Sequence, residues 1–305
     1  MTERLADISA RIEGIRQLGA VVNAMRGIAA ARAQQARGQL VAIDSYAATI
    51  ALAIGRTLAL VPGSGAVHRS SRPALVLFCA EQGFADAFSE RVLDAISTDL
   101  FDSELLLIGA RGHALAVERG IAVGWHGPMP SHSFGIPKLA DRISEALFVR
   151  IALGEIDRLD AVFSQWQPGH GIHIERRRLF PLDPSGFPRP ASADAPLLNL
   201  ASEALLIELT ADYLHAQLCN TALHAFAAEN EARMEAMASA RSQIERQLSM
   251  LQATQRIVRQ EEITAEIIEL AAGETASRSD HTRSGNVTLR TATARTPNVI
   301  GTFAP

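Results

Sequence analysis

The chain has 305 residues, 48% of them hydrophobic, and a formal net charge of −4 at pH 7. It is long enough for one large or two modest domains with a buried core, and its charge gives no electrostatic reason to expect nucleic acid as a partner. Its two cysteines, Cys79 and Cys219, stand in apolar segments, which indicates buried free thiols rather than a disulfide-stapled secreted domain. The N-terminal residues carry charges throughout and no stretch reaches about 20 apolar residues, so we expect neither a signal peptide nor a membrane span.

Residues 1–60 predict a long helix. Apolar residues recur there at steps of three and four, which places them on one helix face. They are Leu5, Ile8, Ile12, Ile15, Leu18, Val22, Met25 and Ile28. Four glycines, from Gly14 to Gly38, weaken the helix intrinsically. We therefore expect a neighbouring element to hold it, because packing stabilises most helices more than propensity does.

Residues 73–196 have a different pattern. Short apolar runs, typical of buried strands, begin at Ala74, Glu104, Ile121 and Asp160. Helix-like stretches lie between them, around residues 85–99, 112–119 and 138–153. This alternation predicts a parallel sheet with helices on its faces. A more polar run from His173 predicts an edge strand or hairpin arm, and we assign its three consecutive arginines, Arg176 to Arg178, to a solvated face.

Residues 197–273 predict a second, longer helix. No glycine or proline occurs in 197–272, and these two residues penalise a helix interior by about 1 and about 3 kcal/mol. Such a helix is roughly 110 Å long at 1.5 Å per residue. Its second half repeats apolar residues at three-and-four spacing: Met234, Met237, Ile244, Leu248, Leu251 and Val258. Two long amphipathic helices at opposite ends of the chain predict an antiparallel two-helix coiled coil with the α/β domain inserted between them, a fold of mixed α+β and α/β class.

The composition changes again at Glu274. Residues 274–305 are rich in serine, threonine and arginine and have no hydrophobic periodicity. We expect a disordered tail.

The residues offer little sign of catalysis. The segment Gly109-Ala-Arg-Gly112 follows a predicted strand, as a phosphate-binding turn does, but it lacks the full G-x-G-x-x-G pattern, so an ordinary strand-to-helix turn is favoured. His170 and His173 have no accompanying cluster of metal-ligand residues and fit a surface loop better. Glu81 and Asp86 lie on the loop after the first strand, where α/β folds bind ligands. We expect no catalytic, cofactor or metal site; the alternative is a nucleotide- or metabolite-binding α/β module with dimerising helices.

Several segments resemble the gamma subunit of F-type ATP synthases. Glu229-Asn-Glu-Ala-Arg-Met-Glu-Ala-Met237 is similar to that family's S-E-x-x-A-R-M-x-A-M segment, and Arg259-Gln260-Glu-Glu-Ile263-Thr264-Ala-Glu266-Ile-Ile-Glu269 resembles its R-Q-x-x-I-T-x-E-x-x-E signature. At the other end, Ala24-Met25 and Ala29-Ala30-Ala31-Arg32 are similar to its A-M-x-x-x-A-A-x-K stretch. Ile108-Gly109 with Arg111-Gly112 resembles its I-G-x-K/R-G strand end. The resemblance runs from Ile8 to about Gly273.

The chain also departs from the family pattern. Arg256 replaces the asparagine that precedes R-Q, and Ala240-Arg-Ser-Gln243 stands in place of A-T-D-N. The D-R-G-L-C-G turn reads Glu81-Gln-Gly-Phe-Ala-Asp86, and the chain continues well past Gly273. These differences indicate a divergent branch, such as an alternative F-type ATPase.

The resemblance implies a long antiparallel coiled coil beside a Rossmann-like domain. It also implies a non-catalytic rotor shaft within a ring of alpha and beta subunits, whose foot binds the epsilon subunit and the membrane ring of c subunits. No nucleic acid takes part. The expected location is peripheral, on the cytoplasmic face of the bacterial inner membrane.

The resemblance further implies which residues touch the beta subunits. Arg259, Gln260 and Thr264, with Glu266 in the same signature, are the expected coupling residues, and Met25 and Arg26 are their counterparts on the facing helix. Ile267, Ile268 and Leu270 are expected to turn in an apolar sleeve at the tip. The alternative is that Ile263, Ile267 and Leu270 only continue the coiled-coil seam. A coiled-coil adaptor without a motor role is a third possibility, less favoured because family signatures occur at both ends.

Overall fold

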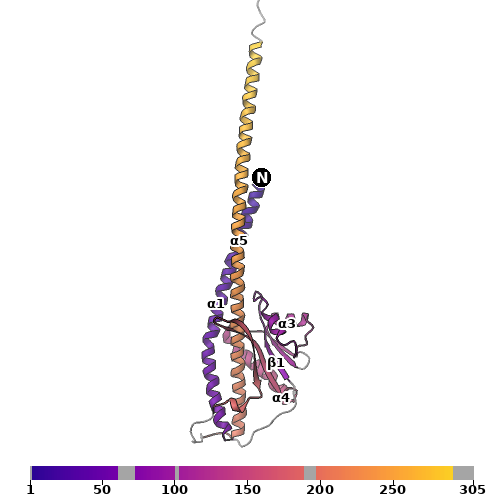
Figure 1. Cartoon of the computed structure of the whole chain (residues 1–305), viewed down its shortest axis with the longest axis vertical. Helices are drawn as coiled ribbons and strands as arrows, with labels where there is room; N and C mark the ends of the chain where they lie inside the picture. The colour runs from indigo at the N-terminus through magenta and orange to yellow at the C-terminus, as the bar shows by residue number, and fades with distance from the viewer. Residues whose placement is uncertain (1, 61–72, 100–102, 189–196, 291–305) are drawn as a thin grey trace, which may run out of the picture. The chain divides into compact units, whose positions relative to one another are not determined.

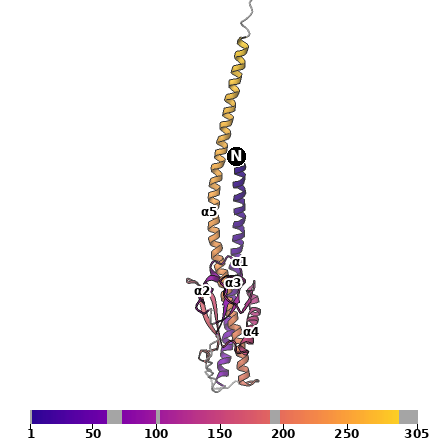
Figure 2. The same cartoon turned by 90° about the vertical axis from the view of Figure 1, so that its right-hand side faces the viewer.

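The computed structural model describes residues 2–60, 73–99, 103–188 and 197–290. Figures 1 and 2 label the α-helices and β1. In chain order the elements are α1 (Thr2–Leu58), β1 (Pro73–Phe78), α2 (Phe88–Asp94), β2 (Glu104–Ile108), α3 (Ala110–Glu118), β3 (Trp125–Gly127), η1 (Ser133–Gly135), α4 (Ile136–Ala152), β4 (Arg158–Gln167), β5 (Gly171–Phe180), η2 (Pro184–Gly186) and α5 (Ser202–Arg290). The chain divides into two compact units, one formed by residues up to Gly19 with those from Gln243 onward, the other by Ala20–Ser242. Each is described by itself.

The first unit is a two-helix coiled coil. Its buried and half-buried positions repeat at steps of three and four on both helices, as a heptad seam requires. They include Leu5, Ile8, Ile12, Ile15 and Gly19 on α1, and Ile244, Leu248, Leu251, Gln255 and Val258 on α5. Gln255 Nε2 donates to Ser9 Oγ at 2.9 Å, whereas Arg4 lies 3.8 Å from Glu261. Earlier α1 residues thus meet later α5 residues, so the predicted antiparallel coiled coil is confirmed.

Small residues hold the same helix pair together in the second unit. Ala29, Ala33 and Ala36 of α1 are at most 1% exposed, and side chains without bulk let two backbones approach closely. From Leu214 to Arg233, α5 has no exposed residue on any side, which is the pattern of a helix surrounded by protein.

Two α1 residues that the apolar periodicity placed on the buried face are not part of the seam. Leu18 is 52% exposed and Ile28 is 53% exposed. Gly19 occupies the seam beside Ile244, where a Cβ on the glycine would lie 3.4 Å from Ile244 Cγ2. Seven residues after Val22 the seam position is Ala29, 1% exposed, so Ile28 falls outside the contact. Those two assignments were wrong because each residue follows two consecutive steps of three, which total six and fall one short of the seven residues of a heptad.

The second unit also contains a five-stranded sheet of order β3-β2-β1-β4-β5. β1 pairs in parallel with β2 and β4, and β2 pairs in parallel with β3. β5 runs antiparallel to β4 at the edge, so the predicted parallel sheet and edge strand are both confirmed. The run from Ile121 was predicted to form a strand, but the strand β3 begins only at Trp125. Just before it, Gly124 N–H donates to the Leu105 carbonyl.

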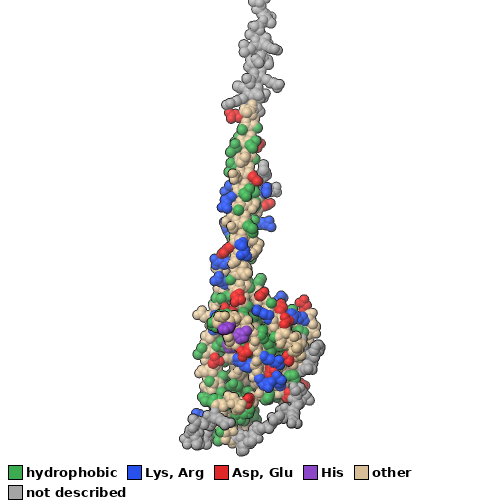
Figure 3. Space-filling view, in the orientation of Figure 1, with side chains coloured by type: hydrophobic (Ala, Val, Ile, Leu, Met, Phe, Trp, Pro, Cys, Tyr) green, Lys and Arg blue, Asp and Glu red, His purple; other side chains and the backbone are tan. Residues whose placement is uncertain are grey.

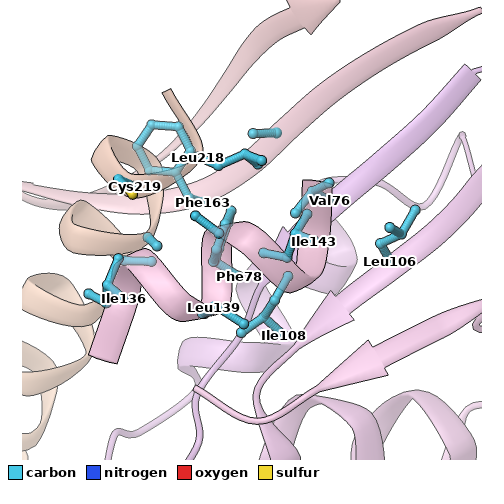
Figure 4. Close-up of a cluster of buried hydrophobic side chains, with 14 of the residues drawn as sticks. Val76, Phe78, Leu106, Ile108, Ile136, Leu139, Ile143, Phe163, Leu218 and Cys219 are labelled. Carbon is cyan, nitrogen blue, oxygen red and sulfur yellow. The ribbon is translucent and has the colours of Figure 1, made fainter. Parts of the chain in front are cut away.

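Both faces of the sheet are buried, as expected for parallel strands covered by helices. Successive residues of a strand point to opposite faces. Leu75 and Leu77 therefore pack on the α2–α3 side, while Val76 and Phe78 pack on the other side against α4 and α5. Figure 4 shows this second cluster, which joins Val76, Phe78, Leu106, Ile108, Ile136, Leu139, Ile143, Phe163, Leu218 and Cys219. The long C-terminal helix is thus part of the core of the α/β domain.

The boundaries of α5 differ from those predicted. The helix begins at Ser202 rather than at 197, and it continues past Gly273 to Arg290, into the segment predicted to be disordered. Glu274 to Arg290 contains no proline, and Thr275 folds its hydroxyl back onto the helix by donating to the Ala271 carbonyl at 3.0 Å. Residues 291–305 of the predicted tail, and 189–196 of the predicted central domain, lie outside the described residues.

Within the described residues, the segment Arg4–Leu58 of α1 is long and apolar enough to cross a membrane by length and composition. A helix that packs within a globular protein passes the same test, so this is weak evidence.

Candidate coupling surface and the joint between helix and sheet

The polar residues expected to contact a partner are exposed on α5. Arg259, Gln260, Thr264 and Glu266 all face solvent. Thr264 Oγ1 donates to the Gln260 carbonyl at 2.8 Å, within its own helix. The structure thus places these four residues on a free surface of the first unit, where an external partner can reach them.

The apolar residues that follow are exposed as well. Ile263, Ile267, Ile268 and Leu270 expose 51%, 60%, 63% and 75% of their surface. The buried or half-buried positions of α5 at this level are instead Val258, at 3% exposure, Glu262 and Ala265. The alternative that Ile263, Ile267 and Leu270 continue the seam is therefore wrong for this chain by itself. Figure 3 shows hydrophobic side chains interleaved with charged ones on the surface of α5.

Met25 and Arg26 lie on α1 in the second unit. Met25 is half-buried and Arg26 is exposed, while Val21 and Ile28 beside them are 55% and 53% exposed. The structure does not bring these residues into one described site with those of α5. Their expected role stays a prediction.

A buried ion pair lies within the recognised segment Glu229-Asn-Glu-Ala-Arg-Met-Glu-Ala-Met237. Glu229 and Arg233, 3% and 5% exposed, stand 2.6 Å apart between Oε1 and Nη2. Gln82 N–H donates to Glu229 Oε1 at 3.2 Å, and Arg233 Nε donates to the Gly83 carbonyl at 3.3 Å. Burial raises the pKa of Glu229, and the Arg233 charge acts in the opposite direction. The sequence interpretation used these residues only as a signature; their i,i+4 spacing is the signal that indicates a pair.

The turn after β2 has no free anion-binding groups among its first N–H groups. Gly109 adopts φ +109°, and the N–H of Ala110, which follows it, donates to Glu81 Oε2 at 2.9 Å. The next two N–H groups donate to the Ala80 carbonyl. The same Glu81 oxygen accepts from Met129 N–H at 2.8 Å. A carboxylate of the chain itself occupies the place that a phosphate takes at such a helix start, so this turn gives no support to the nucleotide-binding alternative.

The candidate metal ligands do not converge. His173 is in β5 opposite Gln165, and His170 Nδ1 lies 3.4 Å from the Pro168 carbonyl. Asp86 lies on the loop after β1 with φ 52°. Among the residues that the structure describes, no group of three or more histidine, cysteine, aspartate or glutamate side chains is arranged to hold a metal ion.

The arginine run of β5 is more than a solvated face, which corrects the prediction. Asp160 of β4, with its side chain 4% exposed, accepts from Arg158 at 2.8 Å and from Arg176 at 2.9 Å, and Arg178 lies 3.4 Å away. Burial by itself raises the pKa of Asp160, but the hydrogen bonds from Arg158 and Arg176 outweigh it and hold the pKa below its usual range. A sequence run of like charges does not show that a buried opposite charge faces it.

The two cysteines are buried and free, as predicted. Burial raises the pKa of each thiol to about 12. Since the thiolate is the reactive form, neither is poised for nucleophilic chemistry at neutral pH.

Comparison with known proteins identifies the family. The ATP synthase family model matches residues 4–276. The ATP synthase gamma chain of Prosthecochloris aestuarii is 27% identical over 287 residues, an alignment that covers 88% of this chain and 97% of that protein. The gamma chain of Flavobacterium johnsoniae is 25% identical over 281 residues, with the same two shares. The chain belongs to the ATP synthase gamma-chain family.

Solved structures show the same fold. The rotor of the Euglena gracilis mitochondrial ATP synthase matches with a TM-score of 0.58 at 12% identity, covering 86% of this chain and 100% of that one. The central stalk and c-ring structure of the Tetrahymena thermophila enzyme matches with a TM-score of 0.52 at 14% identity, covering 72% and 99%. These likenesses show that the fold is shared.

Proposed function

We propose that this gamma chain turns inside a head of three alpha and three beta subunits, and that its α/β domain is held by the epsilon subunit and the c-ring of the membrane sector. The solved Euglena assembly that shares its fold contains a c-ring. The proposed location is the cytoplasmic face of a bacterial inner membrane. We assign no catalytic step to this chain; the chemistry belongs to the head.

The observation that carries the proposal is the uncovered stretch of α5 from Arg259 to Leu270. Four large apolar side chains on it are each more than half exposed, and soluble proteins rarely leave such residues clustered on a surface unless a partner covers them. Arg259 and Gln260 supply charge and hydrogen-bonding groups beside them. An apolar surface with few directional bonds suits a bearing, and polar groups suit contacts that depend on the angle of rotation.

One shaft inside a ring of identical subunits presents a different face to each of them. A subunit shifts between open and closed states only by the difference in its contact free energy with the shaft in the two states. Contacts made by Arg259, Gln260, Thr264 and Glu266 would differ from one beta subunit to the next. Rotation would then move each beta subunit through the same states in turn.

Purification of the assembled complex tests this function. We expect a tagged full-length chain, expressed with the alpha and beta subunits of its own cell, to copurify with them in a ratio of about one to three to three. Complexes that lack both subunits would contradict the proposal. A purified chain that binds ATP or NAD saturably in calorimetry would instead favour the nucleotide-binding alternative.

A further inference from the structure

One turn of α5 concentrates charged side chains in the interior of the second unit. Glu229, Glu231 and Arg233 are 3%, 5% and 5% exposed, and Asn230 between them is 2% exposed. Charged residues are almost never buried to this degree unless each has a partner. The partners of these three lie on different elements of the fold.

Glu229 and Arg233 hold the loop that follows β1. Glu229 Oε1 accepts from Gln82 N–H at 3.2 Å, and Arg233 donates to the Gly83 carbonyl at 3.3 Å and to the Gln82 carbonyl at 3.5 Å. All three bonds go to backbone groups of the loop. They therefore fix the position of the loop on α5 whatever its side chains are.

Glu231 holds the opposite helix. Its carboxylate pairs with Arg37 of α1 at 2.5 Å, and the Arg37 guanidinium lies 4.7 Å from the centre of the Trp166 ring on β4. Residues two apart on a helix point to different sides. The same turn of α5 is thus bonded to α1 on one side and to the sheet domain on another.

At this level α5 contributes only small apolar side chains. Ala228 and Ala232 pack with Ala80, Ala85 and Phe88, and Trp166 and Ile172 lie partly buried against them. Hydrophobic contact is non-directional, whereas charge-assisted hydrogen bonds have preferred lengths and angles. The ion pairs and their hydrogen bonds therefore add directional resistance to slip or twist at this joint, beyond that of the packed core.

We propose that Glu229, Glu231 and Arg233 are positioning residues that lock the α/β domain and α1 to one turn of α5, so that torque applied to the domain reaches the helix pair without loss. The proposal rests on the rotor function. It concerns residues buried inside the chain, distinct from the exposed residues that meet the head.

The test uses the complete ATP synthase in membrane vesicles, carrying Arg37→Met, Glu231→Gln or Arg233→Met in this chain. Three readouts are taken: ATP hydrolysis, ATP-driven ion pumping, and the torsional stiffness of the rotor in single molecules. We expect stiffness to fall and the ratio of pumping to hydrolysis to drop about twofold or more, at the lower end of what changes in a connecting network produce. Arg119→Met is the matched control, because Arg119 pairs with Asp94 at 2.6 Å on the surface, away from this joint.

A charge exchange separates the lock from simple helix stabilisation. The double variant Glu229→Arg with Arg233→Glu restores an ion pair within α5, but an arginine at 229 cannot accept from Gln82 N–H and a glutamate at 233 cannot donate to Gly83. The proposal requires that this variant stay uncoupled, and rescue by it would overturn the proposal.

If Arg233→Met fails to assemble, Arg37→Met decides, since Arg37 is partly exposed and its loss leaves the Glu229 contacts in place. Wild-type stiffness and coupling in Arg37→Met and Glu231→Gln would overturn the lock while leaving the rotor function intact.

Discussion

Helix α5 contains two stretches with opposite relations to solvent. Around Glu229–Arg233, charged side chains are buried and satisfied by the rest of the chain. Around Ile263–Leu270, large apolar side chains are exposed, each by more than half. A buried charge and an exposed apolar cluster are both informative because each departs from the usual arrangement. The first departure is resolved within the chain, and the second requires another molecule.

The largest expected effect comes from breaking the buried stretch. Arg233→Met leaves Glu229 ionisable and buried without its partner, and we expect the free energy of unfolding of the full chain to fall by about 3–5 kcal/mol. Urea denaturation measures it. Arg259→Met, on the exposed stretch, should change the same quantity by no more than about 0.5 kcal/mol. Equal losses in the two variants would erase the distinction between the stretches.

A matched pair of isoleucines sharpens the comparison. Ile12 in the coiled-coil seam is 4% exposed, and Ile267 is 60% exposed. Ile12→Ala should destabilise the helix pair by about 2 kcal/mol or more, because it removes buried methyl groups and leaves a gap. Ile267→Ala should leave thermal unfolding of the chain within about 0.5 kcal/mol of wild type. A stability loss at Ile267 as large as that at Ile12 would show that the chain itself buries this residue in solution.

The polar residues of the exposed stretch should matter only in the complex. Arg259→Ala and Gln260→Ala are expected to alter ATP hydrolysis by the assembled enzyme by about 0.5–2 kcal/mol of coupling free energy, with no loss of stability in the isolated chain. Steady-state hydrolysis measures the effect. The control is Arg246→Ala, which removes an exposed arginine whose bonds go to Gln243 of its own helix. Identical rates in Arg259→Ala, Gln260→Ala and wild type would remove these residues from the coupling surface.

The smallest effect is confined to acid. The pKa of Asp160 is lowered in the folded chain, so the stabilisation is fully present above the unfolded value of about 3.9 and is lost as pH falls through the lower folded value. Stability should therefore decline below about pH 4 with a slope that Asp160→Asn reduces. Urea midpoints from pH 6 downward measure it. An unchanged slope in Asp160→Asn would mean that other carboxyl groups cause the decline.

Periodic apolar residues made the helix pair predictable, and short apolar runs made the strands of the sheet predictable. Ile12 and Val258 occupy the seam as their spacing required, and the runs at Ala74, Glu104 and Asp160 form strands. Ile28 shows the limit, because it follows Val22 by two steps of three and so stands one position before the buried Ala29. Apolar steps of three and four drift from the heptad, and a small residue such as alanine can occupy the seam position instead.

The buried charges were beyond the sequence interpretation for a different reason. In the sequence, Glu231 and Arg233 look like charged residues on a solvated helix face. What distinguishes them is that α1 and the loop after β1 meet at this turn. Arg37, the partner of Glu231, is 194 positions away along the chain, and Gly83, a partner of Arg233, is 150 positions away. Similarly, the polar composition after Gly273 predicted disorder, although helix α5 continues there to Arg290.

The carboxylate of Glu81 has a consequence for the physiology of the subunit. A ligand that binds the folded state stabilises it by an amount that grows with the logarithm of the ligand concentration, but only if a binding site is free. At the start of α3 the acceptor is tethered to the polypeptide and cannot dissociate into solution. The start of α3 should therefore keep the same rigidity while cellular ATP, ADP and phosphate levels rise and fall.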